Sequence, residues 1–355
     1  MLISVIAIGA CFNLAFAPPV LVESDTARQP LYPHQISELA STALPTMRAV
    51  AAILVDVHSG EVLVAQNEHQ RLPPASTTKI MTALLALERG NLEDVVTVGN
   101  EVYIEGARAG LVPGERLTLR DLLYALLLPS GNDAAMAIAR HIAGSEDAFV
   151  ALMNNRAQEL GLADTHFTNP HGLDASDQYS SAYDLQRLAL AALAKPDFAR
   201  IVATRDVTVG SHYWVNRNEL LGDYLGADGV KTGTTEAAGE CLVASATRDG
   251  SQALVVVLGS TDRYADARTL LDYYYAHYAC VPLDAGPQIM NRIRSSDGEW
   301  RALVGGKPPM VLLARWKIPL LRFYRKVSGA DAVLLCFIAD QLLMEIPLAI
   351  APSSY

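Results

Sequence analysis

The feature that most constrains the fold of this chain is the position of its strand-forming runs, which lie at both ends of one long segment with helical patterns between them. Two apolar runs separated by a short turn, within residues 51–65, predict a hairpin. Three further strands are expected late in the segment, at 230–234, 241–247 and 253–258. One antiparallel sheet built from both ends, with helices on its faces, accounts for this order. The sequence therefore predicts an α/β (α+β) domain over residues 49–280.

Three helices are expected between these strands. The first begins at Ser76 and ends before Gly90, and its apolar residues cover most of the circumference, which predicts a buried central helix. The second spans residues 119–128 and stops at Pro129. The third begins at Asp133, whose side chain is of a type that caps helix N-termini.

The two ends of the chain differ from this central segment. Residues 1–22 are almost wholly apolar, which predicts a signal peptide or an N-terminal membrane anchor. Residues 23–48 contain several prolines and no clear periodicity, as in a linker. Residues 283–352 hold short apolar runs separated by Gly and Pro pairs, which predicts a small β-rich C-terminal domain. We therefore expect an exported protein that works outside the cytoplasm, in the periplasm or cell wall.

The composition excludes several classes of protein. The chain has 355 residues, of which 51% are hydrophobic, so it is neither disordered nor too small for a large core. Its 28 Lys and Arg against 38 Asp and Glu give a net charge of −10, which argues against nucleic acid as a partner. No group of Cys and His has zinc-ligand spacing, so we expect no metal and no cofactor.

The most informative chemistry lies at the start of the first helix. Ser76 and Lys79 are three residues apart and so share one face of a helix, where the amine can reach the hydroxyl. A serine needs a base to become a nucleophile, and a lysine whose pKa is lowered by burial and nearby positive charge can be that base. This pair alone is weak support, because the two residue types are common.

Two further motifs strengthen the interpretation. Ser130 and Asn132 lie in the break between the second and third helices, where a hydroxyl can relay a proton and an amide can hold a carbonyl. Lys231, Thr232 and Gly233 lie on an expected strand, where the cation and hydroxyl can hold an anionic terminus. The missing side chain of the glycine is expected to let a ligand approach the backbone.

The three motifs together are the set found in penicillin-binding proteins and class A β-lactamases. The chain resembles the serine-type D-alanyl-D-alanine carboxypeptidases, which are low-molecular-mass penicillin-binding proteins. The segments that carry the resemblance are 74–82, 129–134, 171–174, 178–182, 228–233 and 242–247. The resemblance implies a β-lactamase/transpeptidase-like fold, in which an antiparallel sheet is flanked by helices and joined to a helical sub-region.

The resemblance also implies the reaction, which is removal of the terminal D-Ala from peptidoglycan stem peptides that end in D-Ala-D-Ala. Ser76 would be the acylated nucleophile, Lys79 its general base, and Ser130 the group that passes a proton to the leaving amine. Asn132 would bind the substrate amide. His171 is expected to be structural, because the mechanism already has a base. β-Lactams would acylate the same serine and act as covalent inhibitors.

The remaining site residues are expected to bind the end of the substrate. By resemblance, Lys231 and Thr232 would hold the terminal carboxylate, and Gly233 belongs to the same motif. The backbone N–H of Thr234 would form the oxyanion hole together with that of the nucleophile. Arg217 resembles a family arginine that helps to bind the carboxylate, although a solvated arginine beside a hairpin explains its sequence context equally well.

Alternative activities and a membrane contact stay open at this point. A D,D-endopeptidase or a β-lactamase could use the same scaffold. A β-lactamase needs a glutamate that activates water, but the candidate Glu159 lacks the following Asn, and the second motif has Gly131 in place of Asp. The family often ends in an amphipathic membrane-bound helix, whereas this chain stops at 352–355. Contact with a membrane surface would then involve the N-terminal segment or the basic and aromatic stretch 315–326.

Overall fold

The computed structural model describes residues 20–22, 43–284, 292–294, 300–328 and 331–351. These residues fall into two compact units. The larger unit takes its described residues from 43–281 and 311–315, and the smaller unit contains the rest. Residues 1–19 of the expected signal or anchor at 1–22, and most of the expected linker, lie outside the described residues.

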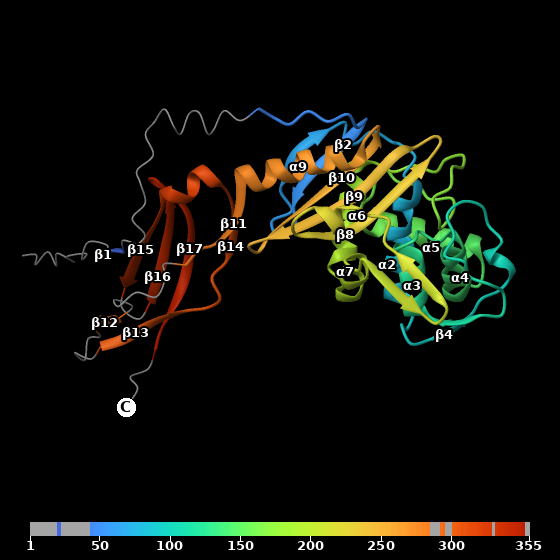
Figure 1. Cartoon of the computed structure of the whole chain (residues 1–355). Coiled ribbons are helices and arrows are strands. Elements are labelled where there is room, and N and C mark those ends of the chain that lie inside the picture. Colours follow the sequence, from blue (N-terminus) through green and yellow to red (C-terminus); the bar gives the residue numbers. More distant parts are fainter. Residues whose placement is uncertain (1–19, 23–42, 285–291, 295–299, 329–330, 352–355) are drawn as a thin grey trace, which may run out of the picture. The chain divides into compact units, whose positions relative to one another are not determined.

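The larger unit is built on one five-stranded antiparallel sheet (Figure 1). Its strands, in spatial order, are β3 (Val62–Gln66), β2 (Ala51–Asp56), β10 (Ser251–Ser260), β9 (Gly239–Arg248) and β8 (Ala227–Thr235). The sheet combines the N-terminal hairpin with three strands that are distant in sequence. The predicted antiparallel sheet is therefore confirmed, with β8 at one edge.

Alternate side chains of the central strands pack into two hydrophobic cores. On one face, Leu54 and Val255 pack with residues of α9 (Arg263–His277) such as Leu271. On the other face, Ile53 and Val256 belong to the core that contains the remaining long helices. All of β2 is buried because both faces of the sheet are covered. Figure 1 shows α9 and the helical sub-region on different sides of these strands.

The helical sub-region surrounds one buried helix, as predicted. A 3₁₀ turn, η1 (Ala75–Thr78), leads into α2 (Lys79–Arg89), and residues 79–86 are all buried. The helices in contact with α2 are α3 (Leu119–Leu127), α4 (Asn132–Ala143), α5 (Glu146–Glu159), α6 (Ala182–Leu193) and α7 (Pro196–Val202). The shorter elements of this unit are β4 (Val95–Thr97), η2 (Asn100–Val102), β5 (Arg116–Thr118), β6 (Asp206–Val209), β7 (His212–Val215) and α8 (Leu220–Asp223).

The prediction that Asp133 caps a helix is wrong. Helix α4 begins one residue earlier, at Asn132, with Gly131 as its N-cap. The Asp133 carboxylate instead accepts hydrogen bonds from the backbone N–H groups of Ala109 at 2.9 Å, Gly110 at 2.9 Å and Leu111 at 3.1 Å. The carboxylate oxygens that could have capped a helix locally are therefore bound to backbone N–H groups of a loop that is distant in sequence.

The smaller unit is β-rich, as expected. Its sheet has the order β1 (Val20–Val22), β15 (Leu321–Ser328), β16 (Asp331–Ile338), β17 (Gln341–Ile350), β13 (Trp300–Gly305) and β12 (Arg292–Arg294). A 3₁₀ segment, η3 (Arg315–Leu320), precedes β15. The separate pair formed by β11 (Tyr278–Pro282) and β14 (Met310–Ala314) falls mostly within the larger unit. Among the described residues, no helix is long and apolar enough to cross a membrane.

Candidate active site

The expected nucleophile and base meet at the junction of η1 and α2. Lys79 Nζ lies 2.9 Å from Ser76 Oγ, 2.7 Å from Asn132 Oδ1 and 2.5 Å from the carbonyl oxygen of His171. Lys79 is fully buried. A neutral amine has one lone pair and two N–H donors. It can therefore accept the Ser76 proton while it donates to the other two oxygens.

The surroundings of Lys79 favour this neutral form. Burial is the main cause that lowers the pKa of Lys79 well below its ordinary value, and the positive charges of Lys231 and Arg217 lower it further. The carboxylate of Asp133 acts in the opposite direction. The lysine therefore has the property that a base near neutral pH requires.

Two glycines pack closely against the nucleophile turn. A Cβ on Gly233 of β8 would lie 2.9 Å from the backbone nitrogen of Ser76 and 2.9 Å from Ala75 Cβ. A Cβ on Gly172 would lie 1.9 Å from the carbonyl oxygen of Ala75. The missing side chain of Gly233 therefore makes room for the protein's own nucleophile turn. Gly233 also lines the cavity, so the expectation that it lets a ligand approach the backbone stays a prediction.

The second motif supplies one free hydroxyl and one bridging amide. Ser130 is buried at the cavity wall, and its Oγ has no hydrogen-bond partner among the described residues. Asn132 accepts a hydrogen bond from Lys79 through Oδ1 and donates one from Nδ2 to the carbonyl of Glu105 at 2.6 Å. Ser130 is thus available to a substrate atom, while Asn132 holds the base in place.

The third motif lies on the edge strand β8. Lys231 is buried, and its Nζ donates to the carbonyl oxygen of Thr232 at 2.9 Å. Burial, followed by the charges of Arg217 and Arg263, lowers the pKa of Lys231 to about 7. Thr234 Oγ1 accepts a hydrogen bond from Arg263 Nη2 at 2.7 Å.

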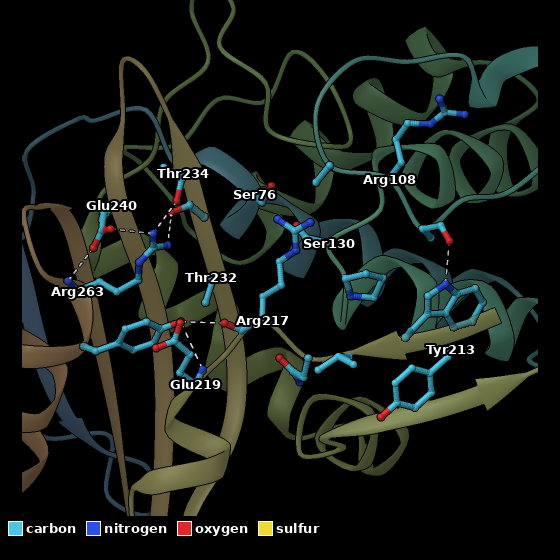
Figure 2. Close-up of a pocket in the computed structure, with 18 residues that line it drawn as sticks. Ser76, Arg108, Ser130, Tyr213, Arg217, Glu219, Thr232, Thr234, Glu240 and Arg263 are labelled. Carbon is cyan, nitrogen blue, oxygen red and sulfur yellow. Dashed lines mark hydrogen bonds and ion pairs between the residues drawn. The ribbon is translucent and has the colours of Figure 1, made fainter.

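These elements border one cavity of about 840 Å³ (Figure 2). Six of the nine predicted site residues line it, namely Ser76, Ser130, Arg217, Thr232, Gly233 and Thr234. The other three, Lys79, Asn132 and Lys231, are buried behind this wall. The structure thus brings the three motifs and Arg217 together in one place.

Arg217 is fixed through its backbone. Its N–H donates to the carbonyl of Leu128 at 3.1 Å, and its carbonyl accepts from the hydroxyl of Tyr264 at 2.8 Å. Figure 2 shows its side chain extending toward Ser130, within the cavity. This position is compatible with binding an anion there.

Sequence reasoning did not identify Arg263 as part of the site. Its guanidinium donates to the carbonyl oxygens of Gly233 at 2.7 Å and Cys241 at 3.2 Å, and it pairs with Glu240 at 3.2 Å. It therefore supports the strand that carries the third motif. Its local sequence indicates only that a helix begins here, with Asp262 as the N-cap of α9. That pattern does not predict contacts between Arg263 and the strands of the sheet.

His171 contributes to the site through its backbone. Its carbonyl binds Lys79, while its ring Nδ1 accepts from the N–H of Leu173 at 3.2 Å. Burial, aided by the charge of Lys79, lowers the pKa of His171 to about 3, so the ring is neutral at pH 7. Glu159, the candidate water-activating residue of a β-lactamase, is not among the residues lining the cavity and pairs with Arg156 at 2.9 Å.

Comparison with known proteins agrees with this geometry. Residues 38–262 match the family described as D-alanyl-D-alanine carboxypeptidase. The chain is 36% identical over 312 residues to the D-alanyl-D-alanine carboxypeptidase DacF of Bacillus subtilis, a match that covers 84% of this chain and 77% of that protein. It is 39% identical over 307 residues to DacD of Escherichia coli, covering 81% and 79% respectively.

Solved structures show the same similarity. Penicillin-binding protein 6B from Escherichia coli aligns with a TM-score of 0.71 and 32% identity, over 88% of this chain and 98% of that one. The Streptomyces K15 DD-transpeptidase aligns with a TM-score of 0.63 and 35% identity, over 66% of this chain and all of that one. This chain therefore belongs to the D-alanyl-D-alanine carboxypeptidase family of serine peptidases.

Proposed function

We propose that this protein removes the terminal D-Ala from peptidoglycan stem peptides through an acyl-enzyme on Ser76. The observation that carries the proposal is the contact between Ser76 Oγ and a fully buried Lys79 Nζ, 2.9 Å apart. Family membership supplies the substrate class, because the relatives are named D-alanyl-D-alanine carboxypeptidases.

In the acylation step, Lys79 Nζ takes the hydroxyl proton of Ser76, and Oγ bonds to the carbonyl carbon between the two D-Ala residues. The backbone N–H groups of Ser76 and Thr234 would stabilise the oxyanion. The C–N bond then breaks, and Ser130 passes a proton to the departing amine of D-Ala, with Lys79 as the source of that proton. Water next attacks the acyl carbon, the bond between that carbon and Ser76 Oγ breaks, and Oγ regains its proton from the water. The shortened peptide leaves as a carboxylic acid.

The end of the substrate would be recognised by charge. We assign its terminal carboxylate to the region formed by the cations Lys231 and Arg217 and the hydroxyl of Thr232, with Gly233 as a part of the same strand. Ordering a long cationic side chain usually costs conformational entropy, which weakens its contact with a carboxylate. This cost is smaller for Lys231, because its side chain is already buried and hydrogen-bonded. In the same way, a β-lactam carboxylate would be held while its ring carbonyl acylates Ser76.

The test combines peptide and inhibitor. The parent protein should release D-alanine from a peptide ending in D-Ala-D-Ala, and intact-mass measurement should show one penicillin adduct per chain. Both activities should disappear in Ser76→Ala and persist in Ser176→Ala, a matched change at an exposed serine of another loop. An adduct that survives Ser76→Ala would contradict the proposal.

The same site could also cut cross-linked peptides as an endopeptidase, and the choice depends on the size of the acceptor strand that the cavity admits. No contact among the described residues favours that variant over the carboxypeptidase. Digestion of purified cross-linked and uncross-linked muropeptides in parallel would compare the two rates directly.

For location, we propose export outside the cytoplasm, with residues 49–280 as the catalytic domain and 283–352 as an accessory β domain. The apolar residues 1–22 support export, and the basic and aromatic stretch 315–326 supports contact with an anionic membrane surface. In that stretch, Arg322 and Lys326 are exposed, and Lys317 Nζ lies 5.3 Å from the centroid of the Trp316 ring. Cell fractionation, followed by sedimentation with anionic and neutral vesicles, tests both parts. The acidic chain is not expected to bind nucleic acid.

A further inference from the structure

Arg108 is a cation at the active-site cavity that the proposed mechanism does not use. It lines the same cavity as Ser76 and Ser130, on the loop between η2 and β5. Figure 2 shows Glu240 and Arg263 at one end of the drawn site and Arg108 at the other, with Ser76 and Ser130 between them. The arginine thus lies well apart, in this view, from the strand that carries Lys231 and Thr232.

The backbone on both sides of Arg108 is tied to the start of α4. The N–H of Asn132 donates to the carbonyl of Ala107 at 2.7 Å, and the N–H of Ala109 donates to the buried carboxylate of Asp133 at 2.9 Å. The indole N–H of Trp214 also donates to the carbonyl of Ala109 at 2.9 Å. Although the Arg108 side chain is not buried, its point of attachment is therefore fixed relative to the second motif.

The charges around the cavity leave Arg108 available for an anion. Arg263 is paired with Glu240, and Arg217 is assigned to the terminal carboxylate. The side chain of Arg108 makes no ion pair or hydrogen bond with any residue that the structure describes. A cavity of about 840 Å³ is in the range that holds a drug-sized ligand, so it has room for more of a peptide than the two terminal residues.

From these observations we propose that Arg108 determines specificity by binding a second carboxylate of the substrate, carried by a residue upstream of the D-Ala-D-Ala terminus. This inference rests on the proposed carboxypeptidase function and deepens it, because it names an acidic peptide as the preferred substrate. The contact forms at a solvent-accessible side chain, so it contributes a modest preference that weakens with salt.

The test compares synthetic peptides that end in D-Ala-D-Ala and carry a carboxylate, a carboxamide or an amine on one upstream side chain. The series places this group one, two or three residues before the terminus. The parent should prefer a carboxylate over the matched carboxamide by about two- to fivefold in kcat/KM at low salt, in one position of the series. The preference should shrink in about 1 M salt, where the screening length is about 3 Å.

Arg108→Gln should abolish this preference, and Arg108→Glu should reverse it in favour of the amine. Arg116→Gln is the matched control, because Arg116 is an exposed arginine of β5 that does not line the cavity, and it should retain the parent preference. The readout is the ratio of kcat/KM for two substrates measured on the same protein sample. A smaller fraction of folded protein lowers both values equally and leaves this ratio unchanged.

A parent without preference at every position, or an Arg108→Gln variant that keeps it, would overturn the inference while leaving the carboxypeptidase function intact. Failure of the parent to release D-alanine from any of these peptides would overturn the proposed function, and this inference with it.

Discussion

Gly172 lies against the carbonyl group of Ala75, the residue before the nucleophile, so closely that a Cβ there would be 1.9 Å from the oxygen. Ala75 itself has a φ of +48°, a conformation that non-glycine residues adopt only when their surroundings impose it. The close packing of Gly172 and Gly233 against this turn provides such surroundings. The position of Ser76 therefore depends on two glycines that take no part in the chemistry.

Substitution of Gly172 should consequently harm acylation as well as stability. Gly172 has a φ of +87°, and Gly144 has a φ of +80° with no atom within 4 Å of the place a Cβ would take, so the two differ mainly in steric contact. Gly144→Ala should cost about 1–2 kcal/mol and leave the penicillin acylation rate unchanged. Gly172→Ala should lose more stability and acylate at least about tenfold more slowly, because small displacements of reacting groups are costly.

Thermal unfolding and acylation kinetics of the two variants provide the comparison. Equal acylation rates in Gly172→Ala and the parent would show that the nucleophile turn does not need this contact.

Asn132 should control the charge state of the base. A carboxylate in Asn132→Asp would stand beside Lys79 Nζ, now 2.7 Å from Oδ1, and would raise the pKa of the lysine. A higher pKa leaves less neutral amine at a given pH, so the acid limb of acylation should move to higher pH. Asn132→Ala removes the hydrogen bonds without adding charge, so it should lower the rate without that upward shift.

The measurement for this pair is the pH dependence of penicillin acylation, recorded for the parent and both variants. Identical limbs in Asn132→Asp and Asn132→Ala would argue that the contact between the amide and Lys79 has no electrostatic role.

Lys231 should set the alkaline limit for substrates that end in a carboxylate. Its pKa of about 7 means that its positive charge is lost as the pH rises through that value in the free protein. kcat/KM, which reports groups of the free enzyme, should therefore fall above about pH 7 for such a peptide. A peptide with an amidated terminus should show little of this decline, because it has no carboxylate to lose contact with the cation.

Arg217→Gln offers a check on the cause, since the charge of Arg217 lowers the pKa of Lys231. The variant should bind the carboxylate more weakly, and its alkaline limb should lie at higher pH than that of the parent. An alkaline limb that stays in place would mean that another group controls it.

Penicillin should be released slowly after it acylates Ser76. Two acidic residues line the cavity, Glu219 and Glu240, and Glu240 is paired with Arg263. Glu159, the candidate water-activating residue of a β-lactamase, does not line the cavity. The opened β-lactam also stays tethered in the site, where it obstructs water. We expect a burst of about one equivalent, followed by turnover far below the ~10 s⁻¹ of typical enzymes. Steady hydrolysis near that rate, measured by loss of β-lactam absorbance, would favour a β-lactamase.

Local patterns in the sequence were sufficient to predict the main sheet, the buried helix and the central catalytic contact, but helices α5, α6 and α7 were not among the three expected between the strands. The hairpin of β2 and β3, the strands β8 to β10 and the buried helix α2 all follow from periodicity and turn residues, which act over a few neighbours. The contact between Ser76 and Lys79 also follows from local geometry, because residues three apart on a helical turn lie on one face. The three motifs together were specific enough to indicate the family.

The tertiary structure alone decided how that contact is held and tuned. Lys79 binds Asn132 and the carbonyl of His171, which are 53 and 92 residues away in the chain, and no local pattern specifies such partners. Asp133 looked like a helix cap because its own neighbours suit that role, yet distant backbone N–H groups take its oxygens. Likewise, burial and the neighbouring cations lower the pKa of both lysines only once the chain has folded, since in water each would remain protonated at pH 7.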